Sequence, residues 1–393
     1  MPSDDVKIVS CAVGRYHTVA LAADGTVLTF GLNDKGQLGR AGTYGVADGD
    51  ACVCDSGGGC ACGGEGEGGA RIGGDARTQL AYEEGDACVG GAACRDGVAR
   101  AVDLSEFGTA AVAVAAGRYA TAAVLASGEV VTWGLNLCGS SRGEADDAKN
   151  SSSDGAPPPI TRESLLRDPR AAATPRLVRG LASESGGSKP VVVVFGYAHM
   201  AILTDDGELY TCDTGFDGYA GGLGSKYTPN GDKRLGRDAP DEASALAPRR
   251  VHVGGAQGGA QGGADGGGSK VSAVSLGRCH AAAATTNGEM FAFGCGALGG
   301  KDPRGFPVRV PDAPSDVYDV ACGEYFTLAS TADGGLFGWG DGNSGQLGTS
   351  GDGKKDNAAV EIDLGARLGE KTRVVAPVAG YQHAMAIAVP GES

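Results

Sequence analysis

One pattern of three glycines recurs along the chain with a fixed internal spacing. The second glycine lies eleven positions after the first, and the third lies seventeen after it. The complete copies are Gly14, Gly25 and Gly31; Gly117, Gly128 and Gly134; Gly277, Gly288 and Gly294; and Gly323, Gly334 and Gly340. Two further copies are incomplete: Gly196 and Gly207, the third copy in chain order, has Asp213 in the third place, and the sixth has Gly380 and Gly391 only. A constant spacing of this kind indicates a repeated structural unit.

Apolar stretches of strand length lie between these glycines. In the first copy they are residues 9–13, 18–22 and 26–30, and the other copies have equivalents. A fourth candidate strand precedes each following copy, at 98–104, 175–181, 247–253, 306–310 and 358–364. Four short strands per unit predict the blades of a β-propeller, in which each blade covers its neighbour. We therefore expect an all-β fold without helices, with five complete four-stranded units and a half unit, as six blades or an incomplete seven-bladed ring.

The copies are separated by inserts of unequal length. Glycine accounts for 71 of 393 residues, about 18% against a usual share of roughly 7%, and part of this excess lies in the insert GGAQGGAQGGADGGG. Such composition predicts flexible connections, which propeller blades tolerate because loop-closure cost grows slowly with length. We expect one propeller domain over 1–393, with flexible inserts at 40–97, 140–173, 220–246, 254–269 and 349–357.

The charge balance narrows the choice of partner. Lys and Arg total 33 against 48 Asp and Glu, which gives a net charge of −15 and a pI near 4.8. Such an acidic chain is poorly suited to a phosphate backbone, so nucleic-acid binding is disfavoured. No apolar run has the length of a membrane span, and the start has no signal-peptide pattern. We expect a soluble cytoplasmic protein without a membrane partner, with the nucleus as the alternative location.

Twelve cysteines are present, and in an intracellular chain of this length we expect reduced thiols. Cys52, Cys54, Cys60 and Cys62 lie within eleven residues and supply enough thiolates for a tetrahedral zinc site. The alternative is a glycine- and cysteine-rich insert with incidental thiols. Both interpretations stay open, and zinc is the only cofactor that the sequence suggests.

Histidine and tryptophan occupy repeat positions, which favours a scaffold role. His17, His199, His280 and His383 each lie three residues after a first glycine, and we expect them to bond neighbouring backbone. Trp133 and Trp339 directly precede a third glycine, as expected of blade-packing residues. The chain contains no P-loop, H-E-x-x-H or G-x-S-x-G motif. We predict no catalytic residues and no small-molecule enzyme.

Two segments carry a family resemblance. Residues 9–39 read VSCAVGRYHTVALAADGTVLTFGLNDKGQLG and residues 320–348 read VACGEYFTLASTADGGLFGWGDGNSGQLG. Both resemble the repeat of the regulator-of-chromosome-condensation family, whose motif is G-x2-H-T, then D-G, then W-G, then G-Q-L-G. The resemblance implies a β-propeller, usually of seven blades, and some members are exchange factors for small GTPases. The second copy ends LNLCGSS and the third keeps neither W-G nor G-Q-L-G, so we expect irregular outer turns there.

The two residues after each first glycine are the candidate binding residues. They include three arginines and five tyrosines, namely Arg15, Tyr16, Arg118, Tyr119, Tyr197, Arg278, Tyr325 and Tyr381. Since every blade repeats one topology, we expect these turns on one face, and Arg and Tyr dominate binding hot spots. We predict a non-enzymatic scaffold or adaptor that grips an acidic or phosphorylated protein segment. The alternative function is a guanine-nucleotide exchange factor for a small GTPase. The alternative role of these residues is structural, with tyrosines that pack between blades and arginines that pair with local acids.

Overall fold

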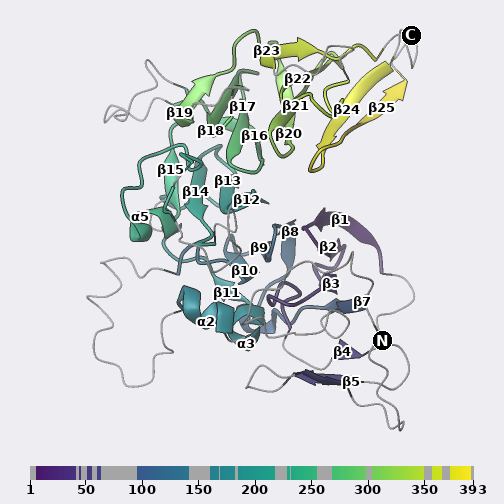
Figure 1. Cartoon of the computed structure of the whole chain (residues 1–393), viewed down its shortest axis with the longest axis vertical. Coiled ribbons are helices and arrows are strands. Elements are labelled where there is room, and N and C mark those ends of the chain that lie inside the picture. Colours follow the sequence, from purple (N-terminus) through teal and green to yellow (C-terminus); the bar gives the residue numbers. More distant parts are fainter. Residues whose placement is uncertain are drawn as a thin grey trace. The chain divides into compact units, whose positions relative to one another are not determined.

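The chain folds into β-sheets that cluster in two compact units (Figure 1). The computed structural model describes residues 6–40, 44–45, 51–54, 60–62, 95–140, 160–181 without 168, 185–216, 228–254 without 231, 268–298 without 297, 303–348, 356–364 and 372–390. The first unit runs to Leu137 and includes the helices and strand that end at Leu177. The second holds Cys138 and most of the chain from Val178 onward.

The first unit contains two four-stranded antiparallel sheets. In spatial order they are β1 (Ile8–Val13), β2 (His17–Ala22), β3 (Val27–Leu32) and β7 (Arg95–Ala101); and β11 (Arg176–Leu177), β10 (Val130–Gly134), β9 (Ala120–Leu125) and β8 (Ala111–Ala116). The unit also contains the small sheet β4 (Tyr44–Gly45), β5 (Ala51–Cys54) and β6 (Cys60–Cys62), with η1 (Ser105–Phe107), α2 (Arg162–Arg167) and α3 (Pro169–Ala173).

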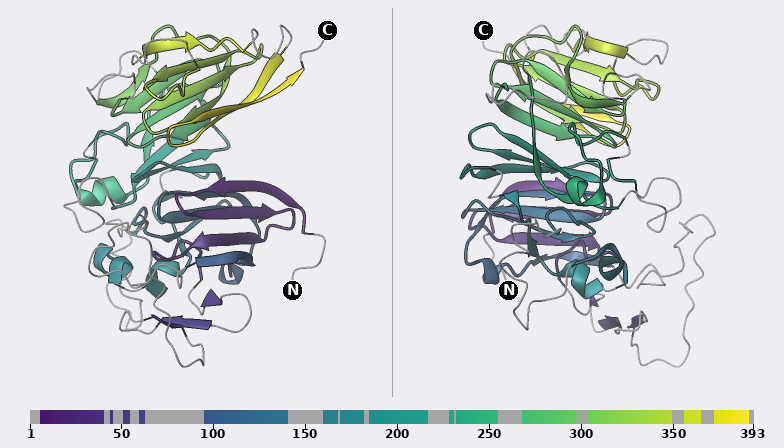
Figure 2. Two further views of the ribbon diagram at one scale, coloured as in Figure 1. Left: turned by 45° about the vertical axis from the view of Figure 1, so that its right-hand side comes forward. Right: turned by 90° about the vertical axis from the view of Figure 1, so that its left-hand side faces the viewer.

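The second unit contains three four-stranded sheets and a two-stranded sheet (Figure 2, where the two-stranded sheet is yellow). In order they are β12 (Pro190–Phe195), β13 (His199–Thr204), β14 (Leu209–Asp213) and β15 (Arg249–Val251); β16 (Val271–Leu276), β17 (His280–Thr285), β18 (Met290–Gly294) and β19 (Arg304–Arg309); β20 (Val317–Cys322), β21 (Phe326–Thr331), β22 (Leu336–Gly340) and β23 (Asp356–Glu361); and β24 (Thr372–Ala379) with β25 (Ala384–Pro390). Helix α5 (Glu242–Leu246) precedes β15.

The predicted all-β architecture of five four-stranded units and a half unit is confirmed. The expectation that the chain lacks helices is wrong, because α2, α3 and α5 lie in segments where we predicted inserts. Local chemistry explains α5: the Asp241 carboxylate accepts from the Ser244 backbone N–H at 2.7 Å, and the Ser244 hydroxyl accepts from the Asp241 N–H. This reciprocal capping box starts a helix without any repeat signal. None of the described helices is long and apolar enough to cross a membrane.

The repeated glycines serve two different purposes. A Cβ on Gly14 would lie 2.2 Å from Cε1 of His17, and one on Gly277 would lie 2.2 Å from Cε1 of His280, so the first glycine makes room for the ring three residues later. The second glycine has a conformational purpose, since Gly25 has a φ of 86°. That left-handed region favours glycine because it lacks Cβ. The first glycine of the repeat therefore meets a packing constraint, and the second meets a turn constraint.

Apolar residues form a core between neighbouring sheets within each unit. In the first unit Val19 and Leu21 of β2 cluster with Ala123 and Leu125 of β9. In the second unit Met290 of β18 clusters with Val320 and Trp339 of the next sheet, among other residues. Each sheet thus covers the apolar face of its neighbour, as blades do in a propeller.

Hydrogen bonds to one carbonyl explain why the histidine, threonine, tryptophan and G-Q-L-G positions recur together. The backbone oxygen of Gln37 accepts from the Trp133 indole N–H at 3.0 Å and from the Thr121 hydroxyl at 2.7 Å. Nε2 of His17 lies 2.9 Å from the same hydroxyl. The partner of this ring nitrogen is therefore a threonine side chain of the neighbouring sheet, whereas we had expected backbone.

The outer turn of the third copy is present, although no G-Q-L-G motif follows this copy in the sequence. Leu235 N–H donates to Oδ1 of Asn230 at 3.1 Å, which matches the 2.8 Å bond from Leu38 to Asn33 in the first copy. An insert displaces this turn along the chain, so its residues no longer follow β14 directly. The prediction of an irregular turn is wrong for this copy.

Four of the cysteines in the described part of the structure form disulfides, so the expectation of reduced thiols is wrong for them. Cys138 pairs with Cys212 with Cα atoms 5.6 Å apart, and Cys279 pairs with Cys295 at 5.4 Å. Among the described cysteines, Cys11 and Cys322 are free thiols. Cys138 lies in the shortened turn of the second copy, and Cys212 occupies the tryptophan position of the third. Two departures from the repeat are thus joined by one covalent bond.

The four cysteines considered for zinc lie on the antiparallel pair β5–β6. Its register places Cα of Cys52 opposite Cys62 and Cα of Cys54 opposite Cys60. Their side chains lie outside the described part of the structure, so zinc binding stays a prediction.

Candidate functional site

Backbone hydrogen bonds join the turns that follow the first glycines within each unit. In the first unit the Arg15 N–H donates to the Gly117 oxygen at 3.3 Å. In the second unit three bonds of the same kind run from the Tyr197 N–H to Gly277 O at 3.3 Å, from the Arg278 N–H to Glu324 O at 3.3 Å and from the Glu324 N–H to Tyr381 O at 3.0 Å. Within each unit, these turns thus lie beside the corresponding turn of the next sheet.

The turns of the first unit present two arginine–tyrosine pairs. The Arg15 guanidinium lies 4.9 Å from the ring centre of Tyr16, and the Arg118 guanidinium lies 5.0 Å from that of Tyr119. Distances under about 6 Å are typical of cation–π attraction. Arg15 and Tyr16 are exposed, while Arg118 and Tyr119 are half-buried. We call these four residues the first-unit pair surface.

The turns of the second unit converge on Arg278. Its guanidinium lies 5.5 Å from the ring of Tyr197 and 5.2 Å from the ring of Tyr325, and these tyrosines belong to the preceding and following sheets. Nη1 of Arg278 also contacts Oε1 of Glu324 at 2.5 Å. A single cation therefore connects turns from three sheets.

Glu324 is the second centre of this group. Its side chain is only 6% exposed, and its other oxygen accepts from Nε2 of Gln382 at 3.3 Å. A hydrogen bond to Glu324 raises the pKa of Tyr381 to about 12, since it holds the phenol in its protonated, donating form. Tyr381 itself is half exposed, at 51%. We call Tyr197, Arg278, Glu324, Tyr325, Tyr381 and Gln382 the Arg278 network.

The structure brings the eight predicted residues together in two groups of four, one in each unit. Sequence reasoning left Glu324 and Gln382 out of the site, although they occupy the same two positions after a first glycine as the others. The alternative interpretation describes Arg278 well, because this arginine pairs with a local acid. An anionic partner would compete there with a carboxylate already in place.

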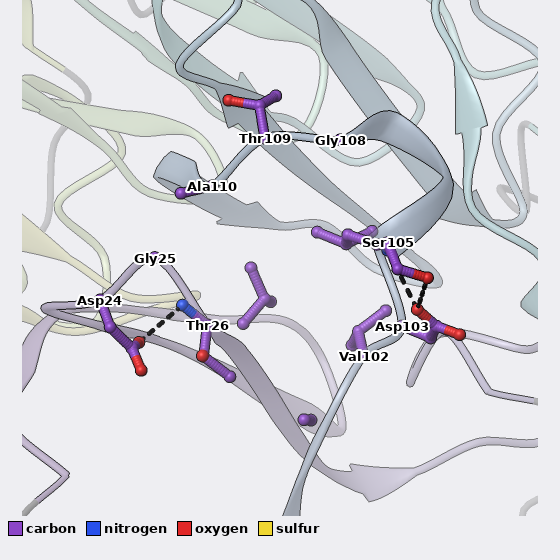
Figure 3. A pocket seen from close by; sticks show the side chains of 12 residues that line it. Asp24, Gly25, Thr26, Val102, Asp103, Ser105, Gly108, Thr109 and Ala110 are labelled. Carbon is purple, nitrogen blue, oxygen red and sulfur yellow. Dashed lines mark hydrogen bonds between the residues drawn. The ribbon is translucent and has the colours of Figure 1, made fainter.

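A separate open groove of about 690 Å³ lies in the first unit (Figure 3). It is lined by Asp24–Val27, Ala101–Ser105 and Gly108–Ala110. Asp24 follows β2, whereas Arg15 and Tyr16 precede it, so the groove lies at the opposite strand end from the first-unit pair surface. Hydrogen bonds from the backbone of Thr26 lower the pKa of Asp24, and bonds from Ser105 lower that of Asp103. Its lining includes no histidine, cysteine or basic side chain.

The sheets and their aligned turns define a protein built from β-propeller blades. Residues 6–37, 111–140 and 317–346 match the regulator of chromosome condensation (RCC1) repeat, and a second form of the same repeat matches residues 333–387. The chain therefore contains repeats of the RCC1 family.

Curated relatives match parts of the chain. The mitochondrial RCC1 domain-containing protein RUG3 of Arabidopsis thaliana is 28% identical over 213 residues, 51% of this chain and 40% of RUG3. The regulator of chromosome condensation of Mus musculus is 29% identical over 195 residues, 47% and 37% of the two chains. The kinase Nek9 of Xenopus laevis is 39% identical over 85 residues, 20% and 9%. The chain spans less than half the length of each of these relatives.

A solved structure supports the fold, and a second one matches the chain more weakly. Human WBSCR16 superposes with a TM-score of 0.62 at 17% identity, covering 98% of this chain and 75% of that one. Prp20p from Saccharomyces cerevisiae gives a TM-score of 0.49 at 16% identity, covering 100% and 84%. At such identities the first likeness concerns the fold alone.

Proposed function

We propose that this chain is a non-enzymatic interaction platform that binds a protein partner through the turns after its first glycines. The observation that carries the proposal is that, within each unit, arginine and tyrosine side chains of neighbouring sheets lie together on turns joined by backbone hydrogen bonds. Such side chains supply large contact area and several hydrogen bonds at low entropy cost. The groove near Asp24 gives no support for catalysis, because its lining has no histidine, cysteine or basic side chain.

The partner segment is acidic or phosphorylated. The first-unit pair surface carries two arginines, and each stacks on a tyrosine that limits its conformational freedom. A guanidinium binds carboxylate or phosphate in a planar, two-pronged manner. The Arg278 network adds aromatic area at no net charge, since Arg278 is balanced by Glu324.

A labelled peptide of ten glutamates and a phosphoserine peptide test this proposal against a polylysine peptide. Replacing Arg15 and Arg118 with alanine should weaken binding of the acidic peptides about tenfold or more without changing the melting temperature. Arg309→Ala is the matched control, since this arginine is 70% exposed and lies on β19, away from the turns. If the wild-type chain binds neither acidic peptide, or if the double variant binds as well as wild type, the proposal is wrong. Arg278 is unsuitable for this test because its replacement would leave the buried Glu324 carboxylate without its cation.

The alternative is a guanine-nucleotide exchange factor for a small GTPase. It is favoured by the sequence match to the mouse regulator of chromosome condensation, together with the exchange activity of some family members. A nucleotide-release assay over a panel of GTPases separates the two functions. A platform leaves the intrinsic release rate unchanged, and an exchange factor accelerates it.

A further inference from the structure

We propose that Cys279 and Cys295 form a thiol–disulfide switch that sets the position of Arg278 and so regulates the Arg278 network. This regulation rests on the proposed function of that surface. Cys279 follows Arg278 directly in the turn, and Cys295 follows the last residue of β18. The bond between them ties the turn that presents Arg278 to the end of the third strand in the same sheet.

In the first copy, the positions of the two cysteines are held by residues with a different role. The positions of Cys279 and Cys295 are held by Tyr16 and Leu32 in the first copy. There the arginine stacks on the tyrosine of its own turn. With a cysteine in that position, Arg278 has no ring in its own turn and stacks on tyrosines of the two neighbouring turns. The substitution that creates the disulfide thus also makes Arg278 a bridge between sheets.

The disulfide adds a constraint that the other copies lack. Cys295 N–H donates to the Cys279 oxygen at 2.9 Å, and the equivalent bond from Leu32 to Tyr16 is 2.8 Å, so the backbone tie is common to both copies. Only the sulfur–sulfur bond is particular to the fourth copy. Its loss leaves the strand pairing in place and releases the turn locally. A less ordered turn must be immobilised again when a partner binds, which lowers affinity.

Accessibility favours exchange at one sulfur. Cys279 is fully buried, whereas Cys295 is half-buried. A thiolate of an external dithiol attacks Sγ of Cys295, the Cys279–Cys295 bond breaks, and Cys279 leaves as a thiolate that takes up a proton. The second thiolate of the dithiol then displaces Cys295, which is protonated in turn. The protein disulfide gains two electrons and two protons, and the dithiol becomes a cyclic disulfide. The Cys138–Cys212 pair is 2% and 0% exposed and resists such attack in the folded state.

Differential alkylation with mass spectrometry tests the switch first. In the oxidised protein, exposed Cys11 should be labelled at once, while Cys279 and Cys295 should be recovered as one cross-linked pair. Mild dithiothreitol should open this pair before Cys138–Cys212. Labelling of both Cys279 and Cys295 in the oxidised protein would overturn the proposal.

Hydrogen exchange and peptide binding test the regulation. Dithiothreitol, or the variant C279S/C295S without reductant, should accelerate amide exchange in residues 277–280 and weaken binding of a peptide of alternating glutamate and tyrosine, whose rings contact the tyrosines of the network, roughly three- to tenfold. The matched variant C138A/C212A should keep the wild-type response of this turn to reductant. Unchanged exchange, or faster exchange with unchanged binding, would refute the switch while the proposed function stands. Failure of both redox states to bind the peptide would contradict the proposed function as well.

Discussion

Arg234 and Asp213 form an ion pair, with Nη2 of the arginine 3.2 Å from Oδ2 of the aspartate, in which both side chains are fully buried. Asp213 occupies the position at which the four complete copies have the third glycine. Arg234 occupies the position at which the first copy has Gln37. Two departures from the repeat therefore neutralise each other inside the second unit. Asp213 avoids the left-handed backbone that Gly31 adopts with a φ of 115°, which explains how a side chain is accommodated.

Breaking this pair should be costly. Arg234→Ala leaves the Asp213 carboxylate buried without its main cation, and such a loss typically costs about 3–5 kcal/mol of unfolding free energy. The double variant D213G/R234Q restores the residues of the first copy and should lose less stability than R234A alone. Urea unfolding of the wild type, D213G, R234Q and the double variant D213G/R234Q gives the coupling energy between the two positions. Additive effects would show that the two departures are independent.

The buried histidines should make the protein sensitive to acid. Burial lowers the pKa of His17 and of His280 from 6.5 to about 4 in the folded state. Below pH 6.5 the unfolded chain takes up protons that the folded chain does not, so stability is complete above this pH and is lost as the pH falls toward 4. Each imidazole accounts for up to about 3 kcal/mol of this loss.

His280→Phe should remove part of that dependence, because Phe326 occupies the equivalent position in the next sheet. Unfolding free energies at pH 7.5 and pH 4.5 measure the effect, and exposed His383→Phe is the control. A pH dependence equal to that of wild type would mean that His280 does not titrate as its burial implies.

Thr121 should be the residue most sensitive to a conservative change in the first unit. Its hydroxyl lies between Nε2 of His17 and the Gln37 oxygen, and its side chain is fully buried. Thr121→Val keeps the shape but leaves the ring nitrogen without this partner, which should cost about 1–3 kcal/mol. Thr18→Val, at the equivalent position of the first sheet, is the comparison. Thermal unfolding of both variants measures the difference.

How far the sequence predicts the structure depends on whether a constraint repeats. The first glycine and the ring three residues later recur in several sheets, so the sheet boundaries around Gly14 and Gly277 could be read from spacing alone. The Arg234–Asp213 pair and the Cys138–Cys212 bond each occur once, between residues that are distant in sequence. In the sequence, such residues look only like departures from the repeat. Their partners are close in the folded structure but do not recur at a fixed spacing along the chain.

The candidate site shows the same limit. Its turn positions followed from the repeat, but the pairing of Arg278 with Glu324 did not, since it depends on which neighbouring turn each side chain reaches. The exchange of a tyrosine for Cys279 was visible in the sequence as an isolated substitution. Its consequence for Arg278 appears only when the adjacent turns are placed side by side.

Glycine at the first repeat position should tolerate no side chain. A Cβ on Gly14 would lie 2.2 Å from His17 Cε1 and 2.4 Å from the Gly117 oxygen, and backbone cannot move aside as a flexible side chain does. Gly14→Ala should therefore destabilise the first unit by about 1–3 kcal/mol, the usual cost of overpacking. Gly97→Ala is the matched control, since a Cβ there meets nothing within 4 Å. Equal melting temperatures for the two variants would contradict this account of the repeat.

Removal of the Cys138–Cys212 bond should destabilise the chain, because the bond closes a long loop. The two cysteines are 74 residues apart, and closing a loop of that length restricts the unfolded chain, which corresponds to about 4 kcal/mol in the chain-entropy description. The turn keeps other ties, because Gly139 N–H still donates to the Leu246 oxygen at 2.8 Å. C138A/C212A should therefore fold but unfold at a lower urea concentration, by about 2–4 kcal/mol. Exposed Cys11→Ala should have no effect, and a double variant as stable as Cys11→Ala would show that the bond does not form in solution.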